Sequence, residues 1–460
     1  QDIVFDGVAE VAGSGAVSYH IAGPATLDSL TLDSDDSVWV DHPGAQLSVR
    51  RASLAGTLRV AGAPTGPLQF LRAGTITGDF GRFRGLDLGA GAYLRPVLGV
   101  SSYDLRPAAL PGGMTVTLPT ADVADDFFAA ISGKDVAPAP GTSLVATLPG
   151  QQLSGDLTLG RVPGATQLIL ADARLRLGDA AAPVATLTAI EPARLSLTDT
   201  ALTGTITGTL TTAAPGIAFD GTFVATVDSS GRPALHGDRV TVVLDGVRIA
   251  DVPITLTAGR VGAGWALQLT APSGGTLLLG AADQPLAVGT LLGALGLTLT
   301  AAGVTGGLPD AALRSLLPTV GLAGTYAVRL GADGVRLTTS AGSLTVADTS
   351  IAGHLELVPV TKDGRPALVV AGADLDVSLF GGLLLLAGLT GGSWTLVRSG
   401  LTGSAGGAGT VSVDGVTGTG TAAIAFGSDD LADGSDAAVD RQPRSTASRG
   451  PPLSVRLTDL

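Results

Sequence analysis

The feature that most constrains this chain is a period of two in its hydrophobicity. The runs 27–32, 47–50, 175–177 and 240–244 alternate apolar side chains with polar or charged ones. In an extended strand, successive side chains point to opposite faces, so this alternation places the apolar set on one face of a sheet. Turn sequences such as Pro43-Gly44 and Asp414-Gly415 separate these runs. The pattern predicts an all-β protein.

The composition favours thin layers of sheet over one thick core. Only 4% of the residues are aromatic, whereas the chain has 67 glycines. Thick cores usually depend on aromatic side chains, which bury large areas, while Gly and Thr suit strands that stack closely. We therefore expect an elongated all-β molecule, with a β-solenoid or β-helix-like N-terminal part followed by further β-rich repeat units.

Two short segments have helical signals. Asp122–Ile131 combines an acidic first turn with apolar Val123, Phe127 and Phe128. Pro309–Leu317 begins with proline, which suits the first position of a helix, and carries three leucines at helical spacing. We expect one or two short helices that act as joints or caps.

One apolar run raises the question of a membrane span. Leu286–Val304 has no charged residue and is long enough to cross a bilayer as a helix. The run is interrupted by glycines and threonines, and it has no flanking Lys or Arg to set an orientation. We expect a buried helix or a strand pair inside a soluble unit.

Degenerate repeats divide the C-terminal three quarters of the chain. Residues 201–227 align without gaps on 400–426 and share Leu-Thr-Gly and several further glycines, and 231–235 echoes 364–368. The two offsets differ, which indicates reuse of strands within related units. The predicted division is a solenoid end at 1–107, a connector with a helix at 108–150, repeat units at 151–335 and 336–427, and a polar linker with a terminal strand at 428–460. For 151–460, a sandwich and a solenoid both remain open.

A recurrent piece is an alternating strand that ends in aspartate. It occurs at 168–172, 195–199, 344–348 and 455–459. Because aspartate bonds to nearby backbone N–H groups, we expect these residues to cap turns, with shared calcium ligation as the alternative.

The residue types needed for catalysis are scarce. There is no cysteine, and the four histidines, His20, His42, His236 and His354, lie far apart without a nucleophile motif nearby. The net charge of -13 repels phosphate backbones, which disfavours a nucleic-acid partner. Since the chain begins at Gln1, we expect a mature chain or a fragment. We expect no enzyme activity and no cofactor, with calcium as the one candidate ion.

Two acidic clusters are candidate sites. Asp33, Asp35 and Asp36 lie near Trp39, where a sugar ring could stack, although a solvated turn explains them more simply. A second cluster could bind calcium through carboxylates, but it lacks the spacing of a calcium loop and also fits a polar linker. Its members are Asp429, Asp430, Asp433 and Asp436.

The stretch 74–105 is the most specific part of the chain. It contains Thr77-Gly78-Asp79-Phe80-Gly81, then Gly85-Leu86-Asp87-Leu88-Gly89 and Tyr93-Leu94-Arg95-Pro96. With the preceding alternating runs, it resembles the closing segment of β-solenoids in large secreted bacterial adhesins and autotransporter-like passengers. It departs from that pattern at Leu98, where the family often has Tyr. Residues 108–460 resemble, more loosely, the Gly/Thr-rich repeats of giant bacterial extracellular proteins.

The resemblance implies a structural component of a bacterial extracellular fibre, surface layer or adhesin, located outside the cell or on its surface. Self-association is expected through the terminal strands, Asp2–Phe5 and Leu453–Leu460, because an open sheet edge can accept another strand. A carbohydrate-binding or polysaccharide-processing β-helix protein is the alternative, with surface glycans as partners. A lipid-binding groove around 286–299 is a weaker one.

Overall fold

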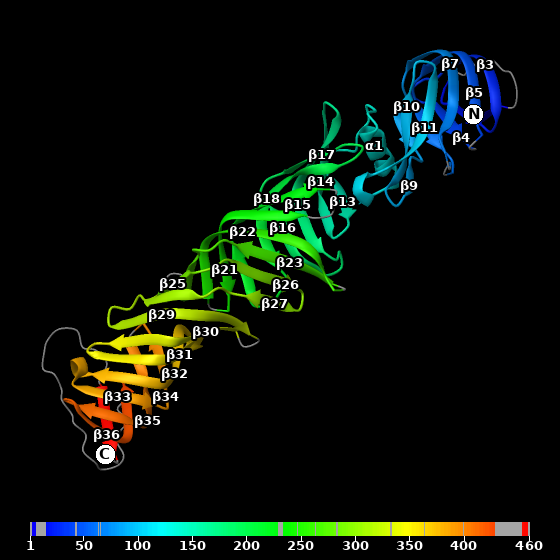
Figure 1. Cartoon of the computed structure of the whole chain (residues 1–460). Helices are drawn as coiled ribbons and strands as arrows, with labels where there is room; N and C mark the ends of the chain where they lie inside the picture. Colours follow the sequence, from blue (N-terminus) through cyan, green and yellow to red (C-terminus); the bar gives the residue numbers. More distant parts are fainter. Residues whose placement is uncertain are drawn as a thin grey trace. The chain divides into compact units, whose positions relative to one another are not determined.

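The computed structural model describes residues 2–5, 15–41, 44–62, 64, 66–228, 233–245, 247–262, 264–281, 284–331, 334–362, 364–398, 400–427 and 453–458. These residues form strands almost throughout, which confirms the all-β prediction (Figure 1). The chain divides into two compact units. The first contains residues 1–209 and 223–235, and the second contains 210–222 and 236–460.

The first unit begins with two sheets of parallel strands. Strands of the first sheet alternate along the chain with strands of the second, so the backbone crosses from sheet to sheet. Side chains such as Tyr19 and Leu27 point inward and are buried. The first sheet contains β1 (Asp2–Phe5), β2 (Ser18–Ile21), β4 (Ser37–Val40), β6 (Thr57–Val60) and β8 (Arg82–Arg84), and the parallel strands of the second are β3 (Pro24–Thr31), β5 (Gln46–Leu54) and β7 (Leu68–Gly78). The β-solenoid class for 1–107 stays a prediction.

Antiparallel strands then close the second sheet. Strand β7 pairs with β11 (Ser102–Ala109), β11 pairs with β10 (Ala92–Leu98), and β10 pairs with β9 (Asp87–Gly89). The turn η1 (Pro111–Gly113) leads to helix α1 (Ala121–Ile131), which confirms the first predicted helix. The Thr120 side chain caps α1 by accepting a hydrogen bond from the Val123 N–H.

The rest of the first unit is antiparallel, and its strands pair in chain order. They are β12 (Thr115–Thr117), β13 (Thr142–Leu148), β14 (Gln151–Val162), β15 (Ala165–Gly178), β16 (Pro183–Ala189), β17 (Ala193–Leu197), β18 (Leu202–Thr212) and β20 (Thr222–Asp228).

The second unit is also antiparallel, and its sheet again follows the chain order. Its strands are β19 (Ile217–Asp220), β21 (Ala234–Leu244), β22 (Val247–Val261), β23 (Gly264–Ala271), β24 (Thr276–Gly280), β25 (Pro285–Leu291), β26 (Leu295–Thr300), β27 (Gly303–Gly307), β28 (Ala311–Ser315), β29 (Val320–Gly331), β30 (Gly334–Val346), β31 (Thr349–Lys362), β32 (Arg365–Leu379), β33 (Leu384–Leu389), β34 (Gly391–Val397), β35 (Gly400–Val413), β36 (Val416–Phe426) and β37 (Leu453–Thr458), with the turn η2 (Phe380–Gly382) after β32.

Three long strands are each shared between two shorter partners. Strand β15 pairs with β17 through its first half and with β16 through its second. In the same way, β22 pairs first with β24 and then with β23, and β32 pairs first with β34 and then with β33. At each change of partner lies an aspartate with positive φ, namely Asp172 (49°), Asp251 (54°) and Asp374 (51°). The left-handed residue lets the long strand bend toward both partners.

The predicted turn cap at Asp172 is therefore wrong. Strand β15 continues through this residue to Gly178, and Asp172 bends the strand instead of ending it. Asp199 and Asp348 do follow the ends of β17 and β30, whereas Asp459 lies outside the described residues.

The repeated sequence corresponds to a repeated strand arrangement. Strands β14–β18 and β31–β35 pair in the same order, and each set contains a bent strand. The aligned glycines Gly204 and Gly403 both have positive φ, and each lies opposite a large buried side chain, Leu195 and Trp394 respectively. A Cβ would lie 2.6 Å from the Arg194 carbonyl oxygen at Gly204 and 2.2 Å from that of Ser393 at Gly403.

The second predicted helix, Pro309–Leu317, is wrong. Residues Ala311–Ser315 form β28, in which Ala311 and Leu313 are buried and alternate with exposed residues. The strand pairs on both sides, with β25 and β29, so backbone pairing prevails over the helical spacing of the leucines. The apolar run 286–304 likewise forms strands, β25 and β26. No helix among the described residues has the length and apolar character to cross a membrane.

Candidate functional site

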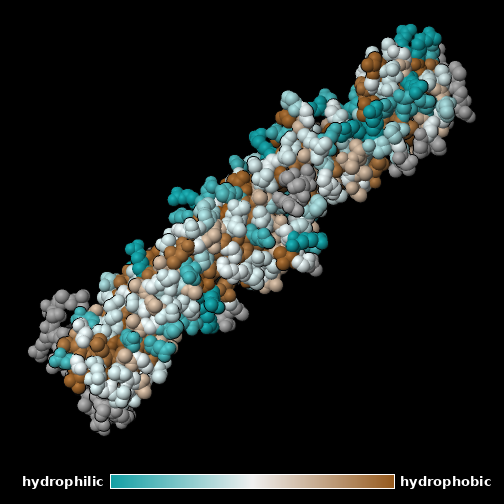
Figure 2. Space-filling model, viewed as in Figure 1, coloured by the Kyte–Doolittle hydropathy of each residue, from teal (hydrophilic) through white to brown (hydrophobic). Residues whose placement is uncertain are grey.

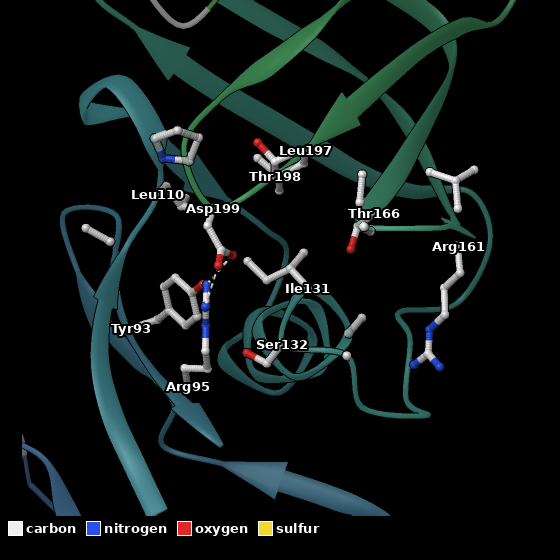
Figure 3. A pocket seen from close by; sticks show the side chains of 17 residues that line it. Tyr93, Arg95, Leu110, Ile131, Ser132, Arg161, Thr166, Leu197, Thr198 and Asp199 are labelled. Carbon is white, nitrogen blue, oxygen red and sulfur yellow. Dashed lines mark hydrogen bonds and ion pairs between the residues drawn. The ribbon is translucent and has the colours of Figure 1, made fainter. Parts of the chain in front are cut away.

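A cavity of about 400 Å³ lies in the first unit, where five segments meet (Figure 3). The closing segment contributes Tyr93 and Arg95 from β10, and the end of α1 contributes Ile131 and Ser132. Residues 109–111 before α1, the tip of the β14–β15 hairpin and the residues at the end of β17 complete the wall. The cavity is thus built from parts of the chain that are distant in sequence.

An ion pair forms one side of the cavity. The Arg95 guanidinium donates from Nη1 to Asp199 Oδ2 (2.7 Å) and from Nη2 to Asp199 Oδ1, and Nη2 also donates to the Tyr93 hydroxyl (3.0 Å). These hydrogen bonds hold the pKa of Asp199 below its usual value and raise the pKa of Arg95. The Nε of Arg95 is buried and has no hydrogen-bond partner among the described residues.

The other side chains that line the cavity differ in the contacts they already make within the protein. The Tyr93 ring stacks on Phe128 with 4.8 Å between centroids, so one ring face is covered. The Ser132 hydroxyl donates to the Phe128 carbonyl at 2.7 Å. On the opposite side, the half-exposed Arg161 lies 3.8 Å from Asp135 and shares the wall with Thr166 (Figure 3). The lining can therefore offer arginine donors and a threonine hydroxyl to a small polar ligand.

A buried carboxylate on α1 fixes the closing segment against the helix. Asp125 on α1 accepts hydrogen bonds from the backbone N–H groups of Gly85 (2.8 Å), Leu86 (2.7 Å) and Asp87 (3.1 Å). Burial raises the pKa of Asp125, and these hydrogen bonds act in the opposite direction. The three N–H groups belong to the Gly-Leu-x-Leu-Gly motif, so the motif provides the surface on which α1 docks.

A second carboxylate links the closing segment to Lys134, three residues beyond the end of α1. Asp79 accepts a hydrogen bond from the Tyr103 hydroxyl (2.6 Å) and forms an ion pair with Lys134 Nζ (2.9 Å). The Lys134 ammonium also lies 4.6 Å from the centroid of the Tyr103 ring. Burial, followed by the hydrogen bond to Asp79, raises the pKa of Tyr103. Together these contacts position the walls that hold Tyr93, Arg95 and Ser132.

The acidic cluster at Trp39 does not form a sugar-binding cleft. Asp36 is buried, and its carboxylate accepts the N–H groups of Val17 and Asp33, both at 2.9 Å, which makes it a turn residue. Trp39 lies opposite His20 on one neighbouring strand and opposite Arg59 on the other. The His20 ring stacks on the Trp39 ring with 5.3 Å between centroids, and the Arg59 guanidinium carbon lies 4.9 Å from the Trp39 centroid. Both ring faces are therefore covered.

The described histidines stay apart. His20, His236 and His354 each lie near one aspartate and on different strands, while His42 lies outside the described residues. Within the described ranges, no group of three or more His, Asp or Glu side chains is arranged to hold a metal ion. The calcium candidates lie outside the described residues: Asp429, Asp430, Asp433 and Asp436.

Sequence reasoning missed the cavity. Tyr93 and Arg95 belong to the closing motif and Asp199 to an aspartate-ended strand, so each residue had a local interpretation. The pair is separated by 104 positions, and no local pattern indicates that they meet.

Two surface features complete the candidate sites. Strands β1 and β37 stand at the edges of their sheets. On the second unit, apolar side chains gather around η2 and the β35–β36 turn, where Figure 2 shows a brown patch. The exposed fractions are 49% for Phe380, 62% for Leu383, 45% for Leu385, 50% for Val413 and 75% for Val416.

Comparison with known proteins identifies no relative. No family model matches the chain, and neither the curated proteins nor the solved structures contain a significant match.

Proposed function

We propose that this chain is a structural component of a bacterial extracellular fibre, surface layer or adhesin, and that it assembles by adding strands at its sheet edges. The observation that carries the proposal is the position of β1 and β37. Each pairs on one side only within the described part of the chain, β1 with β2 and β37 with β36. An edge strand has free N–H and C=O groups that a second copy can pair with.

Two further features support this proposal. The exposed apolar patch around Leu383 and Val416 is of the kind that marks contact surfaces between proteins. The absence of cysteine and the net charge of -13 suit a soluble secreted chain.

Proline substitutions on β1 test the proposal. In a parallel pair, neighbouring residues direct their N–H groups alternately toward and away from the partner strand. Of the two variants Ile3→Pro and Val4→Pro, one therefore removes an N–H donor from the open edge of β1, and the other removes an N–H group that faces β2. The unmodified chain is expected to form extended assemblies in electron micrographs, and the variant without the open-edge donor is expected to lose them. The other variant is the matched control for the loss of β1–β2 pairing. A monodisperse unmodified chain at all concentrations would contradict the proposal.

A second candidate function is favoured by the cavity beside Arg95. The Arg161 guanidinium and the Thr166 hydroxyl of its wall suit a small glycan unit that carries a carboxylate. Titration with galacturonate should shift the amide resonances of this wall, whereas uncharged galactose should shift them less. Arg161→Gln should reduce the response, with Arg174→Gln as the control on the same strand pair. Equal responses to the two sugars would exclude recognition of the carboxylate.

A further inference from the structure

The last strand of the second unit is connected to its partner by an unusually long stretch of chain. In the β36–β37 pair, Phe426 lies opposite Leu453, and the register continues to Thr421 opposite Thr458. Residues 427–452 separate the two paired ends. An antiparallel pair can be joined by a two-residue turn, so this connection is far longer than the pairing requires.

We propose that β37 is an exchangeable strand, which pairs either with β36 of its own chain or with β36 of a second copy. The inference deepens the proposed function and rests on it, because copies must first be brought close together. The 26 residues between the paired ends can span at most about 90 Å when fully extended, which is enough to reach a neighbouring molecule.

The burial of the two strands is unequal. On β36, Ala422, Ile424 and Phe426 are almost fully buried, at 1% exposed each. The described side chains of β37 are only half-buried. Within the described chain, β37 pairs only with β36, and its side chains pack less completely than those of β36. A vacated β36 edge is a template for the same strand from another copy.

The competition between the two arrangements depends on concentration. A tether keeps its strand near its own partner at an effective concentration of the order of millimolar, which decreases as the tether lengthens. Isolated chains therefore keep β37 in place, and exchange becomes significant when an assembly holds copies side by side.

Cysteine cross-linking of the full chain tests the exchange. The chain has no cysteine, so Thr421→Cys and Thr458→Cys introduce a register pair without background. The two single variants, one with a larger tag, are mixed under assembly conditions and oxidised. A disulfide between chains of different size is expected. Thr361→Cys mixed with Thr458→Cys is the control, because Thr361 on β31 is exposed but is not opposite Thr458.

A shortened connection supplies the decisive comparison. Replacing residues 427–452 with Asn-Gly gives a tight hairpin, which should lock β37 onto its own β36 and reduce the mixed disulfide at least tenfold. A mixed disulfide that is no more abundant than in the Thr361 control, or that persists in the shortened chain, overturns the exchange. Light scattering of the same samples reports on assembly separately. Assembly that survives in the shortened chain without the mixed disulfide leaves the proposed function standing and removes only the exchange.

Discussion

At the scale of single residues, the most demanding interaction is the one between Asp125 and the closing segment. Oδ1 accepts the N–H groups of Leu86 and Asp87, and Oδ2 accepts that of Gly85. An asparagine has the same shape but only one acceptor oxygen, so its amide group would face a backbone donor. The local contact therefore depends on a carboxylate and not on a polar side chain in general.

We predict that Asp125→Asn destabilises the docking of α1 by about 1–3 kcal/mol, the cost of a buried donor left without a partner. Hydrogen exchange at the amides of Gly85, Leu86 and Asp87 measures this locally, which is appropriate because a chain of two units need not unfold in one step. Asp122→Asn is the matched control: this residue pairs with Arg84 but is 69% exposed, so a change within about 0.5 kcal/mol is expected. Equal protection in both variants would contradict the assigned role.

The ion pair between Arg95 and Asp199 adds a pH dependence. Because the pKa of Asp199 is lowered in the folded state, the unfolded chain binds more protons in the acid range, and stability rises with pH there. The stabilisation is present above the ordinary carboxylate pKa of about 4 and is lost as the pH falls through the lowered value. Asp199 is 67% exposed, so we expect less than about 1 kcal/mol. Comparison of acid unfolding between the unmodified chain and Asp199→Asn checks this, and curves that stay parallel below pH 4 would contradict it.

At the scale of elements, the aligned glycines Gly204 and Gly403 of the repeated strands should be intolerant of any side chain. Gly403→Ala forces a Cβ against the Ser393 carbonyl oxygen at a φ of 141°, and we expect a loss of about 1–3 kcal/mol. Gly418→Ala on the paired strand β36 is the control, since no heavy atom lies within 4 Å of its added Cβ. Fluorescence of the buried Trp394 opposite Gly403 reports the unfolding, after Trp39 and Trp265 are replaced by Phe. Equal midpoints for the two alanine variants would contradict a steric role.

The same elements show what the sequence could and could not predict. Alternation predicted the strands because it reports which face is buried, and the acidic turn with two phenylalanines predicted α1. The helix at 309–317 failed because only Leu313 of its three leucines lies in β28, and pairing on both sides decided for the strand. Asp172 failed because a left-handed aspartate serves a turn and a strand bend equally well. The cavity at Arg95 depends on tertiary contacts alone.

At the scale of the whole molecule, the net charge of -13 determines how copies of the chain approach one another. Like-charged molecules repel over about one Debye length, which falls from about 30 Å at 0.01 M salt to about 10 Å at 0.1 M. Strand addition at the edges forms backbone hydrogen bonds and buries apolar surface, neither of which salt weakens to the same extent. Added salt therefore removes the barrier and leaves the attraction.

We predict that self-association strengthens as NaCl is raised from about 0.01 to 0.1 M, because screening shortens the range of repulsion. Light scattering at a fixed protein concentration measures the change, and sucrose at matched osmolality controls for effects other than screening. The β1 proline variant that blocks assembly should stay small in both salt conditions. Association that weakens with salt would mean that opposite charges hold the contact, which would place it away from the edge strands and contradict assembly through them.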